Sequence, residues 1–206
     1  MRRAWFALLM AVAVGTGLSG CGGSGDQDSA LIPAAGAYRG SEPPGRIQMP
    51  EFELRDVVSG EQVGPADLRG DAVIVTFVDT DCSDQCPLLA SAMAEALRRL
   101  PSDVREQTTA LAISVNPLVD TRRSVVRFLR QRHADALKYL VGSVAQMKPV
   151  WKRFGVVSAY ETGDADTHSA DVRVFDPEGI WVSTQHSGVD LSPENLAHDI
   201  ILALRG

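Results

Sequence analysis

The sequence predicts an α/β domain built around a central sheet that is parallel in its middle. Two continuous apolar runs, AVIVTFV at 72–78 and ALAISV at 110–115, have the composition of strands that are buried on both faces. Between them, residues 88–100 carry apolar side chains at helical spacing. Strands that alternate with helices in this way form parallel sheets with helices packed on the faces.

The other predicted elements continue this alternation. In chain order they are a β-hairpin at 52–54 and 62–63, a basic amphipathic helix at 121–133, a short strand at 137–141, a helix at 144–154, a second hairpin at 171–175 and 180–184, and a final helix at 192–204. Ser192 is the expected N-cap of the final helix. Pro149 should kink or shorten the helix at 144–154, because proline has no N–H to donate.

The composition limits the classes of function. The 206 residues carry 26 acidic and 20 basic side chains, for a net charge of −6. An acidic chain of this kind excludes nucleic acid as an expected partner, because phosphate binding needs a basic face. Three cysteines are too few for a disulfide scaffold. Nothing in the sequence indicates oligomerisation, so we expect a monomer.

Residues 1–20 predict a lipoprotein signal peptide. Two arginines precede an apolar stretch at 5–14, which is too short to cross a bilayer core of about 30 Å. Leu18-Ser-Gly then leads to Cys21 in a pattern that resembles a bacterial lipobox, in which the cysteine is diacylated and becomes the mature N-terminus. The alternatives are an unmodified thiol at Cys21 or an uncleaved anchor.

The next segment, 21–48, is rich in Gly, Ser, Ala and Pro and predicts a flexible tether, followed by a folded domain at 49–206. The expected location is therefore the extracytoplasmic face of the cell membrane, with the chain anchored by lipid.

The segment Asp81-Cys-Ser-Asp-Gln-Cys-Pro87 carries the chemistry. It follows the buried strand at 72–78, and ligands in such sheets bind at the carboxyl ends of strands. On a helical turn Cys82 and Cys86 lie on one face, with their Cβ atoms about 5–6 Å apart. The two sulfurs can then bind one metal ion or form a disulfide. A purely structural disulfide is disfavoured, because closing so short a loop adds little stability.

The order strand, C-x-x-x-C-P, helix resembles the Sco (SenC) family of thioredoxin-like copper proteins. Further matching stretches are 67–70, 113–117 with 120–121, 154–156, 168–170 and 176–179. The resemblance covers nearly all of the folded part. It implies a thioredoxin-like fold with a central mixed sheet flanked by helices and an N-terminal β-hairpin extension. It also implies that Cys82, Cys86 and His168 bind one copper ion per chain, as Cu(I) or Cu(II). Cu(I) is soft and prefers thiolates, and imidazole also suits copper.

The chain departs from the family pattern at several positions. Thr167 stands before His168 where the family usually has Asp, so the carboxylate that would orient the imidazole is missing there. Asp166 and Asp171 are the candidates to replace it. Asn116 stands where the family usually has Asp in S-x-D-P-E, and Asp81 stands where His or an aromatic residue usually precedes the first cysteine.

Other polar residues near the motif have two interpretations. The loop around Cys82 also holds Asp79, Asp81 and Asp84, which either favour a bound cation or simply form turns. His186 is a minor candidate for an additional ligand. His133 and His198 are expected on the surface.

The family resemblance implies a metallochaperone that delivers copper to the copper A centre of cytochrome c oxidase. The expected partner is the copper-binding subunit of the oxidase or another periplasmic copper protein. The alternative is a thiol–disulfide reductase in which Cys82 attacks a partner disulfide and Cys86 resolves the mixed disulfide. A copper or redox sensor is a third hypothesis. His168 discriminates between the first two, because a reductase does not need it.

Overall fold

The protein forms one eight-stranded mixed sheet with the strand order β1-β8-β7-β4-β5-β6-β2-β3. The computed structural model describes residues 37–205. The strands are β1 (Ile47–Gln48), β2 (Leu54–Asp56), β3 (Gln62–Val63), β4 (Ala72–Val78), β5 (Thr108–Ser114), β6 (Lys138–Val141), β7 (Asp171–Phe175) and β8 (Ile180–His186). The helices are α1 (Gln85–Arg99), α2 (Ser102–Glu106), α3 (Arg122–Gln131), α4 (Val144–Phe154), α5 (Ala159–Thr162) and α6 (Pro193–Ala203), with a 3₁₀ turn η2 at Pro65–Leu68. Both predicted hairpins and the α/β class are confirmed.

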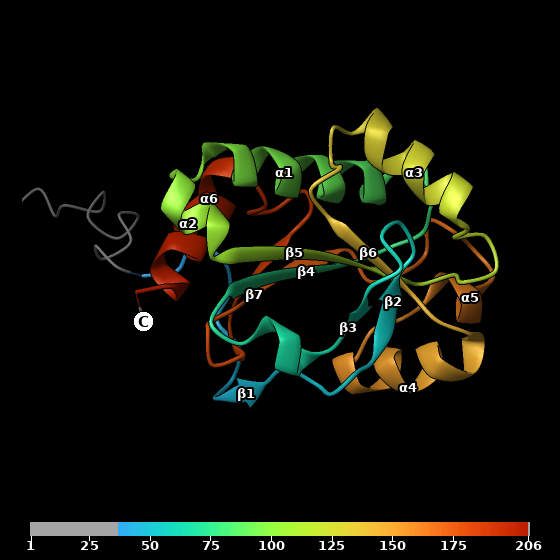
Figure 1. Ribbon diagram of the computed structural model, residues 1–206, viewed down its shortest axis with the longest axis horizontal. Helices are drawn as coiled ribbons and strands as arrows, with labels where there is room; N and C mark the ends of the chain where they lie inside the picture. Colours follow the sequence, from blue (N-terminus) through green and yellow to red (C-terminus); the bar gives the residue numbers. More distant parts are fainter. Residues whose placement is uncertain (1–36, 206) are drawn as a thin grey trace, which may run out of the picture. The chain divides into compact units, whose positions relative to one another are not determined.

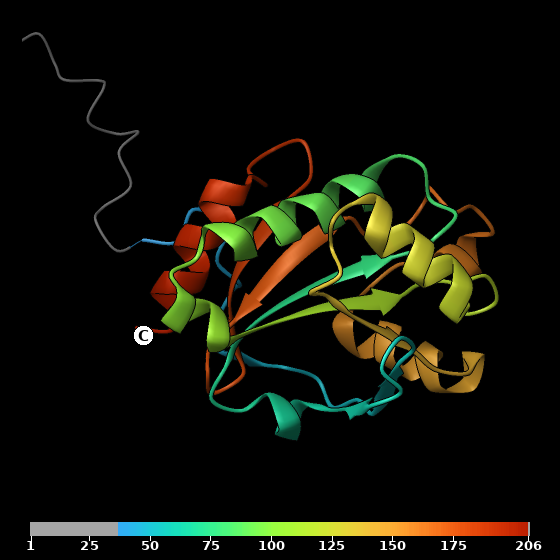
Figure 2. The same cartoon turned by 45° about the horizontal axis from the view of Figure 1, so that its top comes forward.

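The strand β4 is the centre of the sheet. It pairs in parallel with β5 and antiparallel with β7, and β5 pairs in parallel with β6. All seven residues of β4 are buried, as its continuous apolar sequence predicts. Because β4 and β5 run in parallel with Val78 opposite Ser114, their carboxyl ends lie side by side (Figure 2).

Helices cover both faces of the sheet (Figure 1). Alternate residues of β4 divide between two cores, because successive side chains of a strand point to opposite faces. Ile74 and Val78 pack with α1, α3 and α6 on one face, whereas Val75 and Phe77 pack with α4 on the other. The buried α4 side chains Met147, Trp151 and Phe154 belong to this second core, as their helical spacing predicts.

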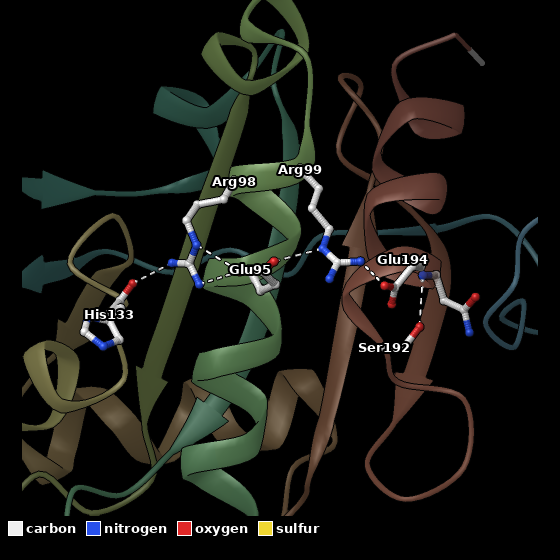
Figure 3. Close-up of polar contacts among 7 residues, drawn as sticks. Glu95, Arg98, Arg99, His133, Ser192 and Glu194 are labelled. Carbon is white, nitrogen blue, oxygen red and sulfur yellow. Dashed lines mark hydrogen bonds and ion pairs between the residues drawn. The ribbon is translucent and has the colours of Figure 1, made fainter.

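Polar contacts position α1 against its neighbours on the first face (Figure 3). Arg99 bonds both Glu95 in its own helix and Glu194 in α6. Arg98 bonds Glu95 and also donates to the backbone carbonyl of His133 at 3.0 Å. His133 has a φ of 51°, the left-handed conformation that commonly follows a helix, so it lies just beyond the end of α3. These exposed ion pairs fix orientation and add little stability.

Several boundaries differ from the prediction. The helix α1 starts at Gln85 rather than at residue 88, because Pro87 fits the first turn, where no intrahelical donor is required. The short helices α2 and α5 were not predicted. Pro149 does not shorten α4, which spans the whole predicted range and starts with a capping box between Ser143 and Gln146.

The sheet also includes residues that we placed in the tether. Ser41 forms a β-bridge with Thr184, and β1 pairs with β8. The backbone N–H groups of Arg39 and Gly40 donate to the Asp199 carboxylate at 2.8 and 3.0 Å. The bonded part of the chain therefore begins about ten residues before the predicted boundary at residue 49.

The acceptor for this segment, Asp199 in α6, is fully buried. It also accepts hydrogen bonds from the Ser183 hydroxyl at 2.7 Å and the Gln185 amide at 2.9 Å, and it lies 3.1 Å from Nδ1 of the partly buried His198. Burial alone raises the pKa of this carboxyl, but the hydrogen bonds outweigh burial and hold the pKa below its ordinary value.

Among residues 37–205, no helix is both long and apolar enough to cross a membrane. The predicted signal peptide and Cys21 lie outside the described residues.

Candidate metal centre

Three potential ligands converge at the carboxyl end of β4. The sulfur atoms of Cys82 and Cys86 and a ring nitrogen of His168 lie within 4.8 Å of one another. Cys82 lies in the Cys loop, residues 79–84, which joins β4 to α1, and Cys86 lies in the first turn of α1. His168 comes from the His loop, residues 163–170, which joins α5 to β7. The structure thus brings together the three residues that the sequence singled out.

Buried hydrogen bonds of Asp79 shape the start of the Cys loop. Its side chain is fully buried and accepts from the Asp81 N–H at 2.8 Å and from the Asn116 amide at 3.0 Å. Its own N–H points to the Cys86 sulfur at 3.4 Å. Burial raises the pKa of the Asp79 carboxyl. Asp79 is therefore part of the packed interior, whereas Asp81 is exposed. Asn116, one of the departures from the family pattern, serves as a donor to Asp79.

A second buried carboxylate, Asp120, holds the middle of the Cys loop. It accepts from the Thr80 N–H at 2.9 Å, the Ser114 hydroxyl at 2.5 Å and the Tyr139 hydroxyl at 2.9 Å. Burial raises the pKa of Asp120 to about 6 and also raises the pKa of Tyr139. Sequence reasoning included Asp120 only as part of a matching stretch and assigned it no role. Its partners come from three other segments of the chain, which no local pattern could identify.

The two cysteine side chains have opposite protonation preferences. The Cys82 sulfur accepts from the Cys86 N–H at 3.2 Å, at the N-terminus of α1. Hydrogen bonds from the Cys86 thiol, His168 and nearby backbone N–H groups lower the pKa of Cys82 to about 5 despite its burial. Cys86 is fully buried, and burial raises the pKa of its thiol. Both cysteines are free of disulfides in the structure. The surroundings of the pair therefore favour a thiolate on Cys82 and a neutral thiol on Cys86.

His168 presents one ring nitrogen to the sulfurs and the other to the backbone. Its Nε2 lies 3.0 Å from the Cys86 sulfur, and its Nδ1 lies 2.8 Å from the Ser169 carbonyl oxygen. A hydrogen bond from Nδ1–H to that carbonyl leaves the Nε2 lone pair facing the site, which is the tautomer that a metal ligand requires. Burial lowers the pKa of His168, but the Cys82 thiolate and the Ser169 carbonyl outweigh it and raise the pKa overall.

Neither aspartate that we expected to orient His168 does so. Asp171 pairs with Arg173 at 3.2 Å. Asp166 instead accepts hydrogen bonds from the Cys loop. The backbone carbonyl of Ser169 takes the position of the missing carboxylate. Every residue has a backbone carbonyl, so the sequence could not indicate this partner.

Thr167, which replaces the usual aspartate of the family, has a local role in the His loop. Its hydroxyl donates to the Asp164 carboxylate at 2.8 Å, and the same carboxylate accepts from the Asp166 N–H at 3.0 Å. These bonds form a compact turn just before His168.

The remaining histidine candidate does not join the site. His186 is exposed at the end of β8, and its Nδ1 lies 3.8 Å from Asp190.

Two sulfur ligands and one imidazole, arranged around a single point, match the preferences of a soft ion such as Cu(I). Zinc also accepts these ligands but usually takes four. The donor set therefore fits copper.

Comparison with known proteins places this geometry in a family. The sequence profile of the SCO1/SenC family matches residues 41–204. A protein of Stutzerimonas stutzeri is 30% identical over 135 residues, which cover 64% of this chain and 65% of that protein, just under two thirds of its length.

Solved structures agree in fold. Bradyrhizobium japonicum ScoI, determined with copper bound, is 26% identical with a TM-score of 0.65, and the match covers 77% of this chain and 100% of that structure. BsSco, described as a member of the Sco family of cytochrome c oxidase assembly proteins, is 17% identical with a TM-score of 0.65 and coverage of 80% and 96%. The chain therefore belongs to the SCO1/SenC family, as a divergent member with a thioredoxin-like fold.

Proposed function

We propose that this chain is a copper metallochaperone that binds one copper ion through Cys82, Cys86 and His168. The observation that carries the proposal is the convergence of the three donor atoms within 4.8 Å. Two features support it: hydrogen bonds lower the pKa of Cys82 to about 5, which favours the thiolate, and a related ScoI of the same family was determined with copper bound. A thiolate is the form of cysteine that binds metal.

Delivery is a ligand exchange in which the copper keeps its oxidation state. One bond from copper to a ligand of this chain breaks as one bond to the acceptor forms. The proposed acceptor is the copper A centre of cytochrome c oxidase, which is supported by the description of BsSco as an oxidase assembly protein. Another extracytoplasmic copper protein would be recognised by the same chemistry.

We further propose that a lipid on Cys21 anchors the chain at the extracytoplasmic face of the membrane. The support is the pattern of residues 1–21, an apolar stretch followed by Leu-Ser-Gly-Cys. The anchor would raise the local concentration of the chaperone near a membrane-bound acceptor. If the proposal holds, the Cys21→Ser chain leaves the membrane fraction of cells; retention there would contradict it.

The test of copper binding uses the full chain, reduced and free of oxygen. It is loaded with Cu(I), washed with a competing chelator, and assayed for copper per chain. Wild type should retain one copper, and Cys82→Ser, Cys86→Ser and His168→Ala should each lose most of it. His186→Ala is the matched control, because this exposed histidine lies outside the site. Retention of copper by the His168→Ala chain would exclude the three-ligand site.

A thiol–disulfide reductase is the second candidate, and the asymmetry of the two thiols favours it. The Cys82 thiolate would attack a partner disulfide and release one partner thiolate. Cys86 would then lose its proton and attack the Cys82 sulfur, which releases the second partner thiol and leaves a Cys82–Cys86 disulfide. Two electrons pass to the partner. Reduction of a protein disulfide by wild type and by His168→Ala at equal rates, without retained copper, would establish this function instead.

A further inference from the structure

Hydrogen bonds from a single side chain join the two loops that meet at the metal centre. The Asp166 carboxylate, in the His loop, accepts from the Ser83 N–H at 2.9 Å and the Asp84 N–H at 3.3 Å. It also accepts from the Ser83 hydroxyl at 3.2 Å. These donors lie in the Cys loop, just before the first residue of α1. The carboxylate therefore binds free backbone donors at the positive end of a helix.

The rest of the His loop is bonded elsewhere. Asp164 bonds Thr167 and the Asp166 N–H within the loop itself. At the other side of His168, Ser169 and Val157 exchange two hydrogen bonds, of 3.0 and 3.1 Å. Among the described residues, the other His-loop side chain that bonds the Cys loop is the ligand His168 itself, through Cys82. Apart from that ligand contact, the Asp166 hydrogen bonds hold the tip of the His loop against the Cys loop.

Asp166 is close enough to His168 in the sequence for its contact to affect the position of the imidazole. Asp166 lies two residues before His168, and the compact turn made by Asp164 and Thr167 connects them. His168 is half-buried, and its ring reaches the sulfurs from the loop side of the site. Movement of the loop tip therefore moves the third ligand, whereas the two sulfurs belong to the Cys loop and to α1.

We propose that Asp166 is a positioning residue that latches the His loop onto the Cys loop and so slows the release of copper. The inference rests on the proposed copper-binding function. With the latch closed, His168 is held beside the two sulfurs. With the latch open, His168 withdraws, and a ligand of the acceptor can take its place on the ion. The closed contact thus favours retention of copper, and the open contact favours its transfer to the acceptor.

The test measures the rate at which Cu(I) leaves the full chain for an excess of bathocuproine disulfonate. Asp166→Ala should still load one copper but release it about tenfold faster, because charge-assisted hydrogen bonds between the loops are lost. Asp166→Asn keeps one acceptor oxygen without the charge. Its rate of copper release should fall between the rates of wild type and Asp166→Ala. Asp81→Ala is the matched control: it removes the same charge from an exposed position beside the site, with no bond to the His loop. Its release rate should change less than about threefold, because exposed charges are screened.

A second measurement needs no copper. Hydrogen exchange at the Ser83 and Asp84 amides should accelerate in Asp166→Ala and stay unchanged in Asp81→Ala. Equal copper release from these two variants overturns the latch. A wild-type chain that retains no copper instead overturns the proposed function, and the amide exchange then decides by itself whether Asp166 holds the loops together.

Discussion

The Cys loop and the His loop meet at one metal centre but are held in opposite ways. The Cys loop is bonded inward, through the buried carboxylates of Asp79 and Asp120. The His loop is bonded mainly to itself, through the exposed Asp164 and Thr167. The start of the Cys loop is thus an extension of the core, whereas most of the His loop lies on the surface.

The different bonding of the two loops shows how one metal site can combine fixed and movable ligands. Local opening costs least where few groups are buried and backbone hydrogen bonds face water. We therefore expect the two sulfurs to keep their positions and the imidazole to be the ligand that moves at low cost. The next three predictions test this contrast, starting with the largest effect.

The pH dependence of alkylation tests the Cys loop most strongly. With a pKa of about 5, Cys82 is about 90% thiolate at pH 6, whereas an ordinary thiol of pKa about 8.5 is about 0.3% thiolate. The thiolate fraction at pH 6 should therefore be about 300-fold higher than that of a model thiol. The measurement is iodoacetamide labelling of the reduced, metal-free chain, resolved by peptide mass spectrometry.

Because Cys82 exposes only 3% of its surface, the midpoint of the pH profile is more informative than the absolute rate. Cys86 should remain unlabelled across the same range, since burial raises its pKa. A Cys82 midpoint near 8.5 would show that the Cys loop does not stabilise a thiolate.

The stability of the protein should depend on the ionisation of Asp120. Its folded pKa of about 6 lies above the unfolded value of about 4, so the folded state binds the proton more tightly. The resulting stabilisation is present below about pH 4 and is lost as the pH rises through about 6. It amounts to about 2 kcal/mol between pH 4 and pH 7. Urea unfolding of the metal-free chain at several pH values measures it.

The Asp120→Asn variant isolates this contribution, because an amide cannot ionise. The difference in unfolding free energy between wild type and variant should change by about 2 kcal/mol from pH 4 to pH 7. Asp164→Asn, the same change in the exposed His loop, should alter the unfolding free energy at pH 7 by less than about 1 kcal/mol. A difference between wild type and Asp120→Asn that is constant with pH would mean that Asp120 is not titrating in the folded state.

The smallest effect is expected at the base of the His loop. Ser169→Ala removes the hydroxyl that accepts from the Val157 N–H at 3.0 Å. Both groups are near water, so the loss in unfolding free energy should be about 0.5 to 1 kcal/mol by urea denaturation. Ser187→Ala, at a partly buried serine in the loop between β8 and α6, is the matched control. A loss above about 2 kcal/mol would show that the His loop is held as firmly as the Cys loop.

The sequence predicted most of the fold because its strongest signals are local. The uninterrupted apolar run of β4, the helical spacing in α1 and α4, and the turn residues between β7 and β8 each depend on neighbouring residues alone. The short helices α2 and α5 were missed, since they are too brief to show a period. The start of the bonded chain was also missed. Arg39 and Gly40 are held by Asp199, which lies 160 and 159 residues away in the sequence.

In the candidate site too, features set by neighbouring residues could be predicted, and features set by distant contacts could not. Spacing predicted that Cys82 and Cys86 lie together, and the resemblance to a family added His168. The two cysteines do not share a helical turn as expected, because α1 begins at Gln85 and Cys82 precedes it. The roles of Asp120, Asp166 and Thr167 could not be predicted, because each depends on which distant backbone donors the fold brings near. The carboxylate expected behind His168 proved to be a carbonyl of the next residue, which no side-chain pattern reveals.

The contacts of Asp199 have a mechanical consequence. The described chain begins beside α6, on the side of the domain away from the tips of β4 and β5 (Figure 2). Tension applied at residue 37 first loads the Asp199 hydrogen bonds and the bridge between Ser41 and Thr184. From there the force passes into α6 and β8, whereas the Cys loop joins β4 to α1 and the His loop joins α5 to β7. Tension on the N-terminal side of the chain is therefore carried first by elements that hold none of the three ligands.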